Sequence, residues 1–181
     1  MERFGLSPLI RFTLLSLYVA LVLPLPVLAP DSLRPLMVAG LILGLVLVVG
    51  LLSEQVETDA AGLRVRYPGW IRWLLRRSWS MEWADIRALV PVGTSQGGTV
   101  YYLKAADCRH QLLPQRIERF DLFLKLLSER ASISTQGIGR LTPPWTYKVL
   151  ACLAALMVVG ELVCGLAISQ GWISLPASYP G

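Results

Sequence analysis

The stretch GLRVRYPGWIRWLLRRSWSMEW, residues 62 to 83, holds four of the six tryptophans and five of the seventeen Lys and Arg residues of a 181-residue chain. Its first part, GLRVRYPG, alternates apolar side chains with arginines and ends at a Pro-Gly pair, which is typical of a β-strand followed by a turn. Alternation returns at SWSMEW, where Trp79, Met81 and Trp83 share one face. The stretch therefore predicts two strands of a small sheet, with these tryptophans in its core.

The segment WIRWLLRR between the two strands follows neither pattern, and it is too apolar for a free surface turn. Tryptophan mixed with arginine is favoured where a protein meets the surface of a bilayer. We therefore expect this linker to lie against lipid head groups or against a partner protein. The candidate interface residues are Trp70, Ile71, Trp73, Leu74, Arg76 and Arg77.

Three long apolar segments surround this region, at residues 12–29, 36–53 and 149–168. Charged residues make up 16% of the chain, against roughly 25% in typical soluble domains. A helix of about 18 or more apolar residues suffices to cross the hydrocarbon of a membrane. The sequence therefore predicts a multi-pass integral membrane protein with three transmembrane helices. Residues 1–53 form an amino-terminal arm and a helical hairpin.

The distribution of basic residues predicts the orientation of these helices. Arg3 and Arg11 precede the first helix, Arg34 lies in the hairpin turn, and the other fourteen lie between residues 54 and 148. Because basic residues favour the cytoplasmic side, we expect residues 54–148 to be cytoplasmic. The tail at 169–181 is then on the other side of a plasma membrane or thylakoid.

Residues 54–132 are expected to form the cytoplasmic domain, followed by a linker at 133–148. Further strands are predicted at IRALVPV, TVYYLKA and RHQLL, where β-branched and aromatic residues are frequent. After Pro114, apolar residues recur at helical spacing in QRIERFDLFLKLLSER. The pattern favours about six short antiparallel strands closed by one amphipathic helix.

Three segments of this domain carry a family resemblance: ETDAAGLRVRY, WSMEWADIRALV and TVYYLKAADCRHQLLPQRIERFDLFLKLL. They resemble the bacterial PH-like domains of integral membrane proteins. Residues 36–130 also resemble, distantly, the two-span photosystem I assembly factors of cyanobacteria and chloroplasts, which lack a helix equivalent to 149–168. The resemblance implies a PH-like antiparallel barrel closed by a carboxy-terminal amphipathic helix, and a function in assembling a membrane complex.

Residues for catalysis, cofactor binding or metal binding are not apparent in the sequence. His110 is the only histidine, and the CxxC and HExxH patterns of zinc sites are absent. The acidic residues Glu54, Glu57 and Asp59 could hold a cation, but we interpret them as solvated charges on an edge strand. The sequence thus predicts a protein that is not an enzyme and has no cofactor.

Within the predicted spans, Glu161 is the single acidic residue. A carboxyl group in a membrane normally faces protein. Two interpretations stay open: a protonated Glu161 hydrogen bonded to Ser16 or Tyr18, or contact with a partner subunit or a bound pigment. Small residues that allow close helix packing occur at Gly40, Gly44 and Gly160, and packing within the chain is favoured over dimerisation.

These features favour an interaction or assembly factor for a membrane protein complex. Photosynthetic complexes are among the candidate complexes. One alternative is a module that binds anionic lipids through the arginines of residues 64–77. A second is a subunit of an intramembrane enzyme or transporter that uses Glu161. Nucleic-acid binding is not expected, because a net charge of +5 matches the basic bias of a cytoplasmic membrane domain. The expected partners are therefore membrane lipids and a membrane protein complex.

Overall fold

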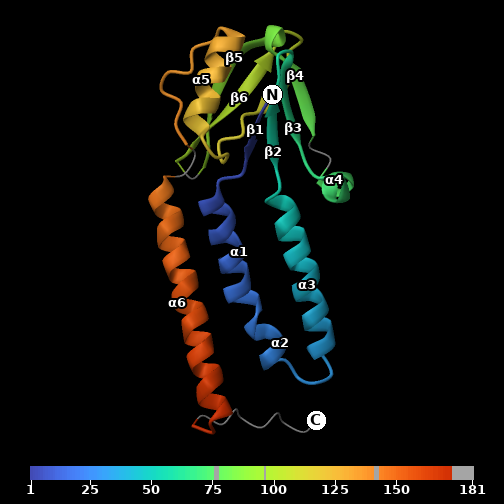
Figure 1. The fold of residues 1–181 in the computed structure, drawn as a ribbon, viewed down its shortest axis with the longest axis vertical. Helices are drawn as coiled ribbons and strands as arrows, with labels where there is room; N and C mark the ends of the chain where they lie inside the picture. Colours follow the sequence, from blue (N-terminus) through green and yellow to red (C-terminus); the bar gives the residue numbers. More distant parts are fainter. Residues whose placement is uncertain (76–77, 96, 141–142, 173–181) are drawn as a thin grey trace. The chain divides into compact units, whose positions relative to one another are not determined.

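The computed structural model describes residues 1–75, 78–95, 97–140 and 143–172. The chain forms two compact units (Figure 1). The sheet unit comprises Met1–Ile10 and Gly50–Pro144, and the helical unit comprises Arg11–Val49 and Trp145–Gly181. The helical hairpin is thus inserted, in sequence, between two parts of the sheet unit.

The helical unit is built from α1 (Pro8–Val22), α2 (Pro24–Leu28), α3 (Arg34–Leu51) and α6 (Pro144–Ser169). In the described part of the chain, three helical stretches are long and apolar enough to cross a membrane: Pro8–Leu28, Arg34–Leu51 and Trp145–Ser169. The first is interrupted at Leu23, since the following proline has no N–H to donate to the preceding turn. Three long apolar helices are therefore present, as the sequence predicts.

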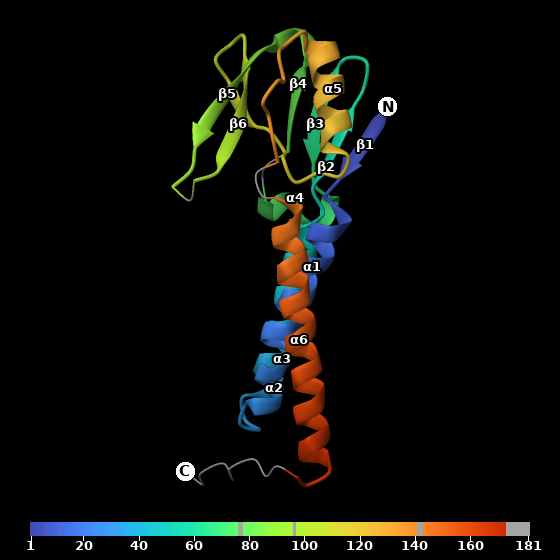
Figure 2. The same cartoon turned by 90° about the vertical axis from the view of Figure 1, so that its left-hand side faces the viewer.

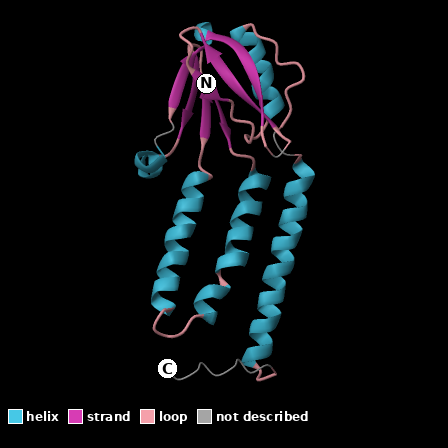
Figure 3. Ribbon diagram, turned by 180° about the vertical axis from the view of Figure 1, so that it is seen from behind, coloured by secondary structure: helices cyan, strands magenta, loops and turns pink. Residues whose placement is uncertain are grey.

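Within the helical unit, α1 lies between α3 and α6 (Figure 3). The Thr13 hydroxyl of α1 donates a hydrogen bond to the Tyr147 carbonyl of α6 over 3.2 Å. On the other side, the Tyr18 hydroxyl of α1 donates to the Leu41 carbonyl of α3 over 2.7 Å. These polar contacts tie both neighbours to α1.

The sheet unit contains two antiparallel sheets among the described residues. The first has the order β1 (Glu2–Gly5), β2 (Gln55–Thr58), β3 (Gly62–Arg66) and β4 (Trp79–Glu82). The second has the order β5 (Ile86–Gly93), β6 (Thr99–Ala105) and β7 (His110–Leu112). The strand β1 corrects the sequence analysis, which treated the residues before the first span as an arm.

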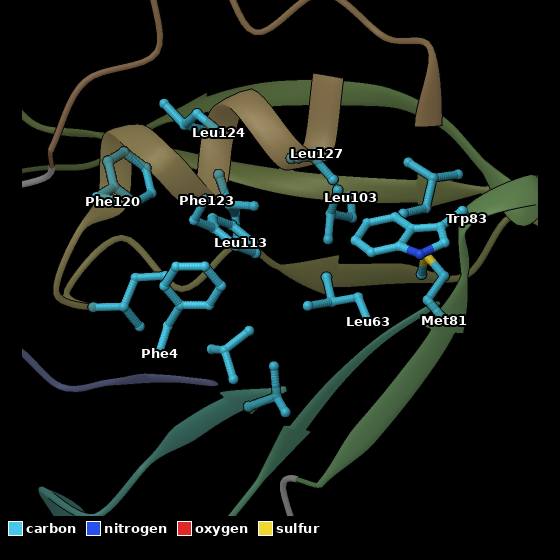
Figure 4. Close-up of a cluster of buried hydrophobic side chains, with 14 of the residues drawn as sticks. Phe4, Leu63, Met81, Trp83, Leu103, Leu113, Phe120, Phe123, Leu124 and Leu127 are labelled. Atoms are coloured by element: carbon cyan, nitrogen blue, oxygen red, sulfur yellow. The ribbon is translucent and has the colours of Figure 1, made fainter. Parts of the chain in front are cut away.

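The core of the sheet unit lies between these strands and α5 (Phe120–Ala131). In Figure 2, α5 crosses in front of β2 and β3. Phe4 of β1 meets Phe123 of α5 edge to face, with ring centroids 5.6 Å apart (Figure 4). Leu63 and Leu103 join them from the two sheets and are fully buried. The predicted amphipathic helix is present, and its apolar face covers the core.

A short 3-10 helix, η1 (Trp83–Asp85), separates the last strand of the first sheet from β5. Trp83 is therefore not the end of a strand, as the alternation of SWSMEW suggested. Its side chain is nevertheless buried, and its indole N–H donates to the Asp59 carbonyl over 2.9 Å. The tryptophan fixes the β2–β3 turn against the core.

The segment Gly5–Ser7, at the end of β1, is hydrogen bonded to the segment Arg116–Glu118, which lies between β7 and α5. The Glu118 N–H donates to the Gly5 carbonyl at 2.8 Å, and the Ser7 N–H donates to the Arg116 carbonyl at 3.0 Å. An isolated bridge between Leu6 and Ile117 lies between these bonds. Over the described ranges the strands form two separate sheets and not one closed barrel, so the fold is mixed helix and antiparallel sheet.

Candidate interaction surface

The structure of the segment WIRWLLRR could not be decided from the sequence. Its residues 70–75 lie in a short helix, α4 (Gly69–Leu75). The N–H groups of Ile71 and Arg72 both donate to the Pro68 carbonyl, each over 3.1 Å. The strand β3 ends at Arg66, and the carbonyl of Pro68 accepts the first bonds of the new helix. The Tyr-Pro-Gly sequence thus turns the chain from β3 into α4.

The helix α4 is attached to the sheet unit by Ile71, whose side chain is 2% exposed. It packs against Gly50, where an added Cβ would overlap the Ile71 side chain and lie 2.8 Å from the Trp70 ring. A glycine at this position therefore permits the close approach. Ile71 was predicted as a contact residue, but its burial makes it an anchor within the fold.

Three other apolar residues of α4 have exposed side chains. Trp70 is 49%, Trp73 is 74% and Leu74 is 48% exposed. The Trp73 indole N–H donates to the Trp70 carbonyl over 2.9 Å, which orients its ring. We call Trp70, Trp73 and Leu74 the α4 face. Two further candidate interface residues, Arg76 and Arg77, lie outside the described residues.

The arginines of β3 are engaged by acidic side chains of the β2 region. Arg66 lies 3.4 Å from the carboxylate of Glu57, which also meets Arg3 of β1 at 3.2 Å. Arg64 lies 3.3 Å from Asp59. Because β2 lies between β1 and β3, the Glu57 side chain is only 9% exposed. The interpretation of Glu57 as a solvated edge charge is therefore wrong.

Asp59 organises the turn between β2 and β3. Its carboxylate accepts hydrogen bonds from the N–H groups of Gly62 at 2.8 Å and Ala61 at 2.9 Å. These two bonds, together with the nearby Arg64 guanidinium, hold the pKa of Asp59 below its usual value. Asp59 therefore has a structural role in the turn.

A second exposed turn uses the same chemistry. The pKa of Asp107 is lowered by hydrogen bonds from the Arg109 N–H, at 3.1 Å, and from the Arg109 side chain. His110 follows in β7 with an exposed side chain. Within the described ranges, no group of three or more His, Cys, Asp or Glu residues is arranged to hold a metal ion.

The glycines predicted to pack helices differ in their surroundings. A Cβ at Gly44 would overlap the Tyr18 hydroxyl, so this glycine admits a side chain of α1. A Cβ at Gly40 or Gly160 would have open space around it. Tyr18 was one suggested partner of Glu161, but its hydroxyl donates to the Leu41 carbonyl. Gly44 therefore serves packing within the chain.

Sequence reasoning missed a cavity in the sheet unit, with a volume of about 830 Å³. Its wall is contributed by residues from β4, β6 and β7, by the end of α3 and the residues that follow it, and by the segment 113–117. Apolar lining residues include Leu52, Trp79, Tyr102 and Leu112. No signal in the sequence singles them out, because the alternation that makes strands also explains each of them.

Fold and surface together define a class of protein. It has a small sheet unit, built from two separate parts of the sequence, and three helices long enough and apolar enough to span a membrane. The chain is 40% identical over 181 residues to the uncharacterized protein slr0269 of Synechocystis sp. (strain ATCC 27184 / PCC 6803 / Kazusa). The match covers 97% of this chain and 89% of the relative. The chain therefore belongs to the same family as this cyanobacterial protein. No family model matches the chain, and no solved structure matches it.

Proposed function

We propose that this chain is a non-enzymatic integral membrane protein whose PH-like sheet unit holds a component of a membrane protein complex. The observation that carries the proposal is the α4 face. Ile71 fixes the helix to the fold, while Trp70 and Trp73 remain about half and three quarters exposed, at 49% and 74%. Tryptophans held in this way are typical of protein contacts, where single residues contribute roughly 2 kcal/mol or more.

A PH-like fold is supported by the order of the elements. Four antiparallel strands are followed by three more and then by an amphipathic helix that covers the core. In this arrangement the helical hairpin Pro8–Leu51 is an insertion between β1 and β2. The bridge between Leu6 and Ile117 adds a contact between the residue that follows β1 and the segment between β7 and α5.

Protein binding explains the surface better than lipid binding does. Two of the five arginines that would serve a module for anionic lipids, Arg64 and Arg66 of β3, already meet Asp59 and Glu57. Ion pairing offsets the positive charge that would attract anionic head groups. The α4 face is apolar, and it fits an apolar patch on a partner protein.

We propose that the sheet unit lies on the cytoplasmic side and that the partner is a complex being assembled in the same membrane. The cyanobacterial relative and the resemblance to photosystem I assembly factors make a photosynthetic complex of the thylakoid the first client to examine. The distribution of basic residues, with fourteen in residues 54–148, supports the orientation.

Affinity purification from gently solubilised membranes tests the proposal. The full chain should recover a stoichiometric membrane protein, and the double variant Trp70→Ser/Trp73→Ser should lose it by more than about tenfold, the equivalent of ~1.4 kcal/mol. The matched control is Trp145→Ser/Trp172→Ser, which changes two other exposed tryptophans. Equal recovery by both double variants, or no stoichiometric partner for the unaltered chain, would contradict the proposal.

A further inference from the structure

The cavity of the sheet unit is distinct from the α4 face, and none of the three residues of that face lines it. Its volume of about 830 Å³ lies within the range of roughly 300 to 1,000 Å³ that is usual for small-molecule sites. The wall combines aromatic and aliphatic side chains, including Trp79, Tyr102 and Leu112, with a few polar ones. Such a lining suits a molecule with an apolar body and a polar end.

The charges of the wall limit what that polar end can be. The described lining residues include one acidic side chain, Glu54, and one basic side chain, Arg116, and the polar ones also include Ser78, His110 and Gln111. A ligand with a net charge would be attracted by one of these two side chains and repelled by the other. Hydroxyl, carbonyl and imidazole groups instead match an uncharged head that both donates and accepts hydrogen bonds.

The course of the chain indicates where the ligand comes from. Leu51 and Leu52 line the cavity, and Leu51 is the last residue of α3, a helix long and apolar enough to cross a membrane. The wall is therefore covalently continuous with a span-length helix. An amphiphile of the bilayer would be available next to such a wall, where its polar end meets water.

The base of the cavity is formed by residues of the packed core. Leu113 and Ile117 line it, and both also belong to the buried core cluster, with exposures of 1% each. Figure 4 shows Leu113 within that cluster, to which Phe123 also belongs. The rim is more open, because Leu112 is 49% exposed. The cavity is thus preformed at its base and accessible at its edge.

From these observations we infer that the sheet unit binds a neutral amphiphile of the membrane, with an acyl-type chain between Trp79, Tyr102 and Leu112 and an uncharged head at the polar rim. This ligand site goes beyond the proposed binding of a protein through α4. The two proposals rest on different residues, so that either can fail alone.

Photolabelling of the full chain in phosphatidylcholine nanodiscs tests the inference. The probe is a monoacylglycerol that carries a diazirine on its acyl chain, and the labelled residues are located by mass spectrometry. We expect saturable labelling of peptides that contain Trp79 and Leu112, competed by unmodified monoacylglycerol. Labelling of α1, α3 and α6 provides an internal standard, because it reports contact with bulk lipid.

Two substitutions fill the cavity from different strands: Leu112→Trp in β7 and Val100→Trp in β6, both at lining positions. The matched control is Leu122→Trp, on α5, where the leucine is 39% exposed and does not line the cavity. Each filling variant that keeps the unfolding temperature of the unaltered chain should lose cavity labelling by about tenfold or more. Leu122→Trp should retain it.

Three results would overturn the inference. One is labelling confined to the long helices, and another is unchanged cavity labelling in a folded filling variant. The third is stronger competition by the matching fatty acid than by the monoacylglycerol, which would show that the head is anionic. If both filling variants unfold, competition in the unaltered chain decides. Cavity labelling that unmodified monoacylglycerol abolishes shows a bound ligand, and cavity labelling that it leaves unchanged shows contact with bulk lipid and overturns the inference.

Discussion

At the scale of single residues, Gly50 determines how α4 is held. A Cβ there would overlap the side chain of Ile71, which is buried, so a larger residue fits only if the Ile71 and Trp70 side chains shift. By contrast, Gly40 in the same helix α3 has open space around the position of a Cβ. The two glycines form a natural pair for comparing a packing role with helix propensity.

We predict that Gly50→Ala destabilises the sheet unit by about 1 to 3 kcal/mol, the usual cost of overpacking a tight contact. Gly40→Ala should be neutral or slightly stabilising, because alanine favours helix more than glycine does. Unfolding of the full chain in detergent, followed by tryptophan fluorescence, measures both. Equal effects of the two substitutions would contradict the packing role of Gly50.

Asp59 gives a prediction of pH dependence. The N–H groups of Gly62 and Ala61 lower the pKa of Asp59 in the folded chain. In the unfolded chain the pKa of an aspartate is about 3.9. The stabilising effect of its charge is therefore present above that pH and is lost as pH falls through the lower folded value.

The comparison of the unaltered chain with Asp59→Asn should consequently reveal a stability difference at neutral pH that narrows below about pH 4. Asp31→Asn is the control, since its carboxylate is 91% exposed and pairs only with Arg34 at 2.9 Å in the described structure. A difference that stays constant with pH would show that the Asp59 charge does not support the turn.

At the scale of elements, β1 contributes more than its four residues suggest. It covers one edge of β2, places Arg3 beside Glu57 and inserts the fully buried Phe4 into the core. Phe4 meets Phe123 and lies beneath the Arg119 guanidinium, which is 5.4 Å from the ring centre. The sheet unit therefore depends on residues that precede the first apolar helix.

We predict that Phe4→Ala costs about 3 to 5 kcal/mol of stability, as is usual for a phenylalanine removed from a core. Phe12→Ala is the matched control, because that ring is 72% exposed in α1. Limited proteolysis of the membrane-embedded chain should then cut the sheet unit of Phe4→Ala and leave Phe12→Ala resistant. Similar resistance of both variants would place Phe4 outside the stabilising core.

Elements with strong periodicity could be predicted from the sequence, and those set by distant contacts could not. The apolar helices and the amphipathic α5 follow from length and spacing alone. The strand β1 was missed because four residues carry little pattern and its partner β2 lies beyond a helical hairpin. The helix α4 was undecided because its stability depends on the contact between Ile71 and Gly50.

At the scale of the whole molecule, the positions of basic residues predict the orientation of the chain in a membrane. The exposed Cys108 lies in the turn between β6 and β7, and so reports the side on which the sheet unit is found. A membrane-impermeant maleimide should label Cys108 in inside-out vesicles and not in right-side-out cells or organelles. The control Cys108→Ser/Ser32→Cys, with its thiol in the hairpin turn, should give the opposite result.

Part of the candidate interaction surface could be predicted from the sequence. Its tryptophans were selected because their mixture with arginine fits neither strand nor turn, and Trp70 and Trp73 are indeed exposed. Burial of Ile71 and the pairing of Glu57 required knowledge of which strands are neighbours. The cavity needed the same knowledge, since its wall combines residues from separate strands of both sheets.

The placement of β1 before the hairpin also sets an order of events during synthesis. The partner of Glu2–Gly5, Gln55–Thr58, is made some 50 residues after them, a delay of roughly 3 to 10 s at about 5 to 20 residues per second. Both helices of the hairpin are translated in that interval. The sheet unit can thus complete its first sheet only after the whole hairpin has been translated.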